Sequence, residues 1–192
     1  MPLAGILSAF GLSGAAGLNA YIPLLLVAVL GRLGVVELGE PWSILTHTWA
    51  IVLISVLLVV ELVVDKVPGA DHINDIVQTF IRPAAGAILF AANAGVITHA
   101  HPAIPLVLGL VVAFSVHATK AAARPVVNAS TLGIGAPVVS VIEDLISVAA
   151  SVAAIFAPLI VLGIVAVFIV VVFMVWSRRR QQKPLKAAAA RG

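Results

Sequence analysis

Long apolar runs, separated by short polar segments, restrict this chain to a membrane environment. Only 10% of its 192 residues are charged and 62% are hydrophobic, with a mean hydropathy of +1.20. Soluble domains carry roughly 25% charged residues, so the charges here are too few to cover a water-facing surface. We therefore predict an all-α, polytopic transmembrane helix bundle, with the lipid bilayer as its main partner.

Six segments have the apolar character of a crossing, which needs roughly 20 residues. They are residues 3–30, 48–64, 82–98, 104–119, 136–156 and 159–176. The first is long and contains Gly11, Gly14, Gly17, Asn19 and Pro23, which predicts a kinked or broken helix. Pro68 and Gly69 end the second, and a short interfacial helix is expected over 71–80.

These segments form one predicted transmembrane domain over 1–176, followed by a basic tail over 177–192 that we expect to be disordered. With six crossings, ten of the eleven Lys and Arg residues lie on one side and only Arg32 lies on the other. Cytoplasmic loops are enriched in these residues, so the pattern predicts a multi-pass inner-membrane protein with cytoplasmic N- and C-termini. The basic residues cluster after the last apolar run, which indicates anchoring to anionic lipid and not nucleic-acid binding.

Catalytic and cofactor motifs are missing from the sequence. There is no cysteine, which excludes disulfides, thiolate metal sites and cysteine nucleophiles. Gly133 and Gly135 are not followed by the Lys-Ser/Thr of a nucleotide-binding loop, and the serines have no base at a useful spacing. The sequence predicts neither an enzyme nor a cofactor. Its small residues allow close helix packing, and a homo-oligomer is compatible with the pattern.

Acidic residues inside the apolar segments are the strongest functional signal. A carboxylate near the middle of a bilayer costs at least roughly 2.5–3.5 kcal/mol, so it must face the bundle interior and find a proton, a cation or a basic partner. The candidates for a transport or ion-binding site are Glu61, Asp65, Lys66, Glu143 and Asp144. They predict binding and translocation of a small ion or solute through a charged intramembrane cavity. The alternative is a structural or regulatory subunit whose buried charges only fix the helix register.

Two further sites follow from the basic residues and from one polar cluster. Arg82 and Arg124 each precede proline at an expected helix start, and with Lys120 they suit an anionic lipid headgroup or phosphate. Asp71, His72 and Asp75 have the ligand types of a metal site without a recognised zinc spacing. His117 reads as an interfacial residue at a helix end.

Several strings taken together resemble one protein family. They are residues 13–21, 61–75, 82–86, 124–130 and the pair Glu143-Asp144. These strings are similar to a bacterial membrane protein family catalogued only as domain of unknown function 4126, and the resemblance extends over about 3–175. It implies a membrane fold and location, and it carries no activity.

Overall fold

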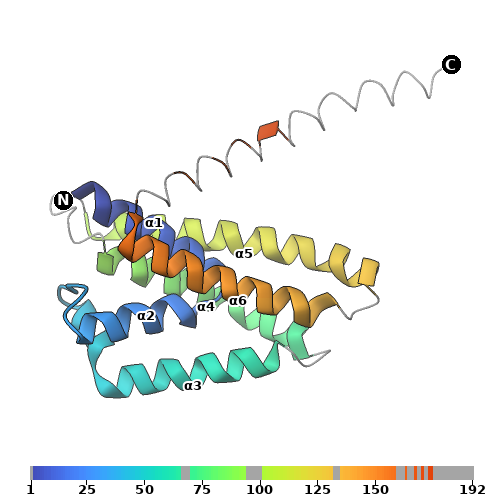
Figure 1. The fold of residues 1–192 in the computed structure, drawn as a ribbon, viewed down its shortest axis with the longest axis horizontal. Coiled ribbons are helices and arrows are strands. Elements are labelled where there is room, and N and C mark those ends of the chain that lie inside the picture. The colour runs from blue at the N-terminus through green and yellow to red at the C-terminus, as the bar shows by residue number, and fades with distance from the viewer. Residues whose placement is uncertain are drawn as a thin grey trace.

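The computed structural model of the protein is a helix bundle (Figure 1). It describes residues 2–65, 70–93, 101–131 and 135–158, with five isolated positions at 163, 167, 170, 173 and 174. The elements are α1 (Pro2–Leu18), α2 (Tyr21–Arg32), the 3-10 helix η1 (Trp42–Thr46), α3 (Thr48–Val64), α4 (Ala70–Asn93), α5 (Ala103–Thr131) and α6 (Gly135–Phe156). No strand occurs in the part of the chain that the structure describes. The all-α prediction is confirmed.

Three of these helices are long and apolar enough to cross a membrane: Ile76–Asn93, Ala103–Ala123 and Pro137–Phe156. Three shorter apolar helices, Leu3–Leu18, Tyr21–Arg32 and Thr48–Val64, accompany them. The protein is therefore a membrane protein by the length and composition of its helices. Apart from the five isolated positions, the predicted crossing over 159–176 and the tail over 177–192 lie outside the described residues.

The first apolar segment is broken at Asn19 and Ala20, as its sequence predicts. The two halves of the segment, however, do not continue in the same direction. The Ser8 hydroxyl donates to the Ala154 carbonyl at the end of α6, while Arg32 at the end of α2 bonds to Thr48 at the start of α3. Both ends of the segment thus lie at one end of the bundle, and α1 and α2 run in opposite directions as a helical hairpin (Figure 1).

The tip of this hairpin lies partway along the bundle. Leu18 is level with Lys120 in α5, and Asn19 is level with Asp144 in α6, well inside both of those helices. At 1.5 Å per residue, α1 is about 25 Å long and α2 about 18 Å, each shorter than the roughly 30 Å hydrocarbon core. The pair enters the bundle from one side and returns to that side.

Small residues bring α1, α4 and α5 into backbone contact. A Cβ added at Gly17 would lie 2.5 Å from the Ala113 carbonyl oxygen, and one added at Gly109 would overlap the Gly86 carbonyl oxygen. The Ser13 hydroxyl, which is fully buried, donates to the same Gly86 carbonyl at 2.9 Å. Packing of this kind is the usual source of helix association in lipid, where the hydrophobic effect between helices is absent.

α4 is one continuous helix, and this corrects two expectations. The short interfacial helix predicted over 71–80 is the first part of α4, and Arg82-Pro83 lies inside that helix instead of starting one. A buried stripe explains the continuity, because Gln78, Arg82, Ala85 and Leu89 follow each other at helical spacing through the proline. Packing of this stripe offsets the cost of a proline inside a helix.

α5 likewise continues through Arg124-Pro125 to Thr131, so the second expected helix start is also wrong. Three alanines, Ala121–Ala123 in sequence, precede Arg124, and alanine has the highest helix propensity of all residues. The strong helix formers directly before the proline favour extension of α5 beyond the predicted end at Thr119.

The first half of α4 is polar inside and apolar outside. Ile76 and Phe80 are 58% and 75% exposed, whereas Gln78 is only 2% exposed. The apolar side chains of this segment therefore face outward, toward lipid, and Gln78 is buried in the bundle. The turn expected at Pro68 and Gly69 lies outside the described residues.

Candidate functional site

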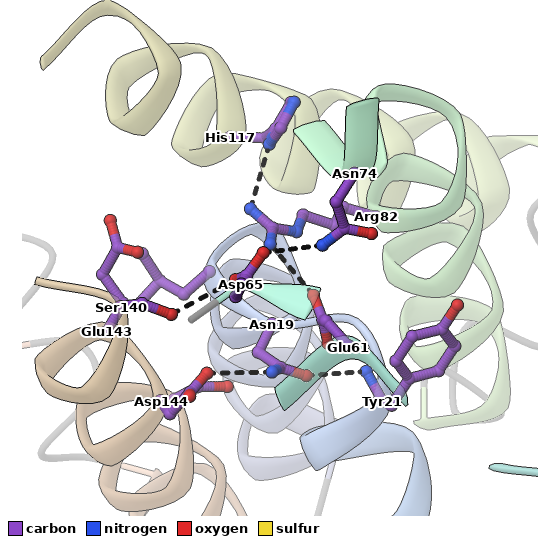
Figure 2. A network of polar contacts seen from close by, with 12 residues as sticks. Asn19, Tyr21, Glu61, Asp65, Asn74, Arg82, His117, Ser140, Glu143 and Asp144 are labelled. Carbon is purple, nitrogen blue, oxygen red and sulfur yellow. Dashed lines mark hydrogen bonds and ion pairs between the residues drawn. The ribbon is translucent and has the colours of Figure 1, made fainter. Parts of the chain in front are cut away.

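The candidate site surrounds the break between α1 and α2. Asn19 is 1% exposed, and its Oδ1 accepts hydrogen bonds from the backbone N–H groups of Tyr21 (3.0 Å) and Ile22 (3.2 Å). Its Nδ2 donates to Asp144 Oδ1 at 2.9 Å (Figure 2). Asparagine is a favoured residue for satisfying the free N–H groups at a helix start. One side chain therefore closes the start of α2 and ties it to α6.

A lysine satisfies the other end of the break. Lys120 of α5 donates from Nζ to the backbone carbonyl of Leu18, the last residue of α1, at 3.1 Å. The same Nζ lies 2.7 Å from Glu143 Oε2 of α6, and the two side chains are 4% and 13% exposed. The carbonyl end of a helix carries partial negative charge, so an ammonium group is stabilised there.

A second ion pair links α3 and α4. Arg82 Nη2 donates to Glu61 Oε1 at 3.0 Å, with side-chain exposures of 0% and 2%. Arg82 Nη1 lies 3.3 Å from His117 Nδ1 in α5, and Thr79 Oγ1 lies 3.1 Å from His117 Nε2. Figure 2 shows the guanidinium between the carboxylate and the imidazole.

This geometry determines the protonation of His117. A guanidinium can only donate hydrogen bonds, so Nδ1 must accept and the ring proton must be on Nε2, which donates to the Thr79 hydroxyl. His117 is therefore a neutral imidazole while Arg82 keeps this position. It is 3% exposed, and the prediction that it is an interfacial helix-end residue is wrong.

Asp65 completes the network at the end of α3. Its Oδ1 accepts from Asn74 Nδ2 at 2.6 Å, and its Oδ2 accepts from the Ser140 hydroxyl at 3.2 Å. These bonds join α3, α4 and α6 through one carboxylate that is 5% exposed. Hydrogen bonds to an ionised carboxylate are stronger than those between neutral groups.

Some polar atoms of the site have no hydrogen-bond partner within the described part of the chain. They are Glu61 Oε2, Gln78 Oε1 and Arg82 Nε. A buried polar atom without a partner costs about 1–3 kcal/mol, so native proteins leave few of them. These atoms lie on neighbouring side chains, so this part of the bundle has hydrogen-bonding groups that a bound ion or solute could use.

Negative charge exceeds positive charge among the described side chains of the site. The described part of the site holds four carboxyl groups, those of Glu61, Asp65, Glu143 and Asp144, and two basic groups, those of Arg82 and Lys120. When all six are ionised, the difference is two negative charges. Charged groups at membrane depth are expensive and need partners. The excess favours the binding of positive charge.

The structure brings together six of the predicted site residues: Glu61, Asp65, Glu143, Asp144, Arg82 and Lys120. Lys66 and the side chains of Asp71, His72, Asp75 and Arg124 lie outside the described residues. Among the side chains described, no group of three or more metal-ligating residues forms a metal site. Sequence reasoning missed Asn19, Gln78 and His117 as members, although each is a polar residue within an apolar stretch of the sequence.

Arg82 does not have the surroundings assumed for an anion site. That hypothesis relied on a helix N-terminus next to the arginine, and Arg82 lies in the interior of α4 instead. Its guanidinium already bonds to a carboxylate. An anion would therefore have to displace Glu61.

A comparison with protein-family models matches residues 6–178 to the family described as Domain of unknown function (DUF4126). No curated protein and no solved structure matches the chain. The match covers all the helices of the site.

Proposed function

The chain belongs to the DUF4126 family, whose description assigns no activity. We therefore propose a function from its own residues: the protein binds and translocates a small, positively charged ion or solute. The observation that supports this most strongly is the meeting of two half-helices midway along the bundle, beside the carboxylates of Glu143 and Asp144. Transporters place their binding sites at such breaks, where helix ends supply partial charges inside the membrane.

The two helix ends at the break are not equivalent. The N–H groups at the start of α2 are already engaged by Asn19, which leaves little capacity for an anionic cargo there. The carbonyl end of α1 attracts positive charge, and Glu143 and Asp144 lie beside it. This asymmetry favours a proton or a cation over phosphate or a lipid headgroup.

The hairpin changes the orientation expected from the sequence. We place the α3–α4 and α5–α6 turns on the cytoplasmic side of an inner membrane, because Lys66 and Arg124 are near them in the sequence. The start of α1 is at the other end of the bundle, together with the loop that follows Arg32. The N-terminus is then external, whereas the basic C-terminal tail is cytoplasmic.

Topology reporters test this orientation. A reporter fused before Pro2 and one inserted near Gly39 should both give the external signal, and one fused after Arg180 should give the cytoplasmic signal. The reason is that α1 and α2 return to the side from which they enter. Opposite signals from the first two positions would show that the first segment crosses the membrane, contrary to the hairpin.

Ion flux in liposomes tests the function. The purified protein, reconstituted with an entrapped pH-sensitive dye, should acidify the lumen when a membrane potential drives protons inward. Glu61→Gln and Glu143→Gln should each reduce the initial rate roughly tenfold or more, since each removes a titratable carboxylate while retaining size and hydrogen bonding.

Glu37→Gln is the matched control for the flux measurement. Glu37 is exposed in the loop after α2, away from the site, and its replacement should leave the rate unchanged. Gel filtration and melting curves establish that each variant is folded. Folded Glu61→Gln and Glu143→Gln proteins with full flux would contradict the proposal. A folded wild-type protein without flux would favour the structural or regulatory alternative.

A further inference from the structure

The ammonium group of Lys120 is in the position where a coupling cation would be expected. Its Nζ contacts the terminal carbonyl of a half-helix, Leu18 O, at 3.1 Å and a carboxylate oxygen of Glu143 at 2.7 Å. Lys120 belongs to α5, so its charge reaches the end of α1 from a different helix.

The same set of ligands suits an alkali cation. In transporters with broken helices, the carbonyl ends of half-helices and nearby acidic oxygens coordinate the coupling ion. Backbone carbonyls and carboxylates are also the oxygen donors that hard cations prefer. An ammonium group carries the same single positive charge and offers three donors, so it satisfies these oxygens in the same way.

We propose that Lys120 is a built-in cation that takes the place of Na⁺ or K⁺ at the end of α1, so that the protein requires no alkali cation. The proposal rests on the proposed function and deepens it by naming the class of ion that this site excludes. Protons or a cationic solute then remain as the cargo. Lys120 is a specificity-determining residue, because it decides which cation can enter.

Chemical rescue separates this role from that of an ordinary ion pair. Lys120→Ala removes the ammonium and leaves space beside Leu18 O and Glu143. An alkali cation should then bind there, and ligands that bind only the folded state raise the melting temperature. Lys120→Met also removes the charge but fills the space, so a cation should not be able to bind.

The measurement is the melting temperature of each purified protein in NaCl, KCl or choline chloride at equal ionic strength. We expect the wild type to melt within about 1 °C in all three salts. Lys120→Ala should melt at least about 3 °C higher in NaCl or KCl than in choline chloride, and Lys120→Met should show no difference. Should Lys120→Ala not be recovered as a folded protein, Lys120→Ser, which also leaves the space open, replaces it with the same expected response.

Two results would overturn the proposal. One is a wild-type protein that Na⁺ or K⁺ stabilises over choline, which would mean that a separate alkali-cation site exists. The other is a folded Lys120→Ala or Lys120→Ser protein without any response to the cation. Because the readout is thermal stability, its result does not depend on flux. If the rescue is observed but no flux is, the proposal for Lys120 holds and the proposed transport function is wrong.

Discussion

Arg82→Met should destabilise the protein by about 3–5 kcal/mol, the cost of breaking a buried ion pair from one side. Arg82 and Glu61 are 0% and 2% exposed, so the carboxylate would remain at membrane depth without its partner. His117 would also lose the donor to its Nδ1. Methionine retains most of the length of the arginine stem, so the effect reports charge and hydrogen bonding more than packing. Melting curves in detergent give the size of the change.

A second replacement tests whether the uncompensated carboxylate is the cause. Arg82→Met combined with Glu61→Gln should recover a large part of the lost stability, because no isolated charge remains. Arg32→Met is the matched control: Arg32 is exposed and bonds to Thr48, and its loss should cost about 0–1 kcal/mol. Equal losses of stability for Arg82→Met and Arg32→Met would show that the Arg82–Glu61 pair is not the cause of the destabilisation.

Gly109→Ala should cause the second large loss, lowering the melting temperature by about 5–10 °C. A Cβ at this position overlaps the Gly86 carbonyl oxygen and lies 2.5 Å from Phe90 Cβ. Both neighbours are fixed by the backbone of α4, so no side-chain rotation relieves the contact and the helices must separate. Overpacking of this kind typically costs 1–3 kcal/mol or more, and about 2–4 °C per kcal/mol is expected for a chain of this size.

Gly14→Ala is the matched control in another helix interior. A Cβ added at Gly14 meets no atom within 4 Å, so the substitution should retain or slightly raise stability through the higher helix propensity of alanine. A similar loss at both glycines would attribute the effect to something other than the α4–α5 contact.

The sequence predicts the class of fold and the break at Asn19, because both are local properties. Apolar runs of crossing length require lipid, and asparagine and glycine interrupt a helix wherever they occur. The reversal of direction between α1 and α2 was not predicted, since a kink and a hairpin have the same local signals. Only the packing of α1 against α4, α5 and α6 distinguishes them.

The acidic members of the site were predictable for an energetic reason. A carboxylate in an apolar helix must be buried whatever its neighbours are, and Glu61 and Glu143 are. Their partners depend on how each helix is rotated and placed, which no local pattern determines. Arg82-Pro83 was mistaken for a helix start because the proline was weighed without the buried stripe on both sides of it.

The hairpin of α1 and α2 has a consequence for how the protein is made. α1 comes before its partners α4, α5 and α6 in the chain, so it leaves the ribosome before they do. Neither α1 nor α2 is long enough to be inserted as a crossing by itself. The central helix of the finished bundle must therefore wait at the membrane surface until the later helices are in place. Assembly of this protein does not follow the order of its synthesis.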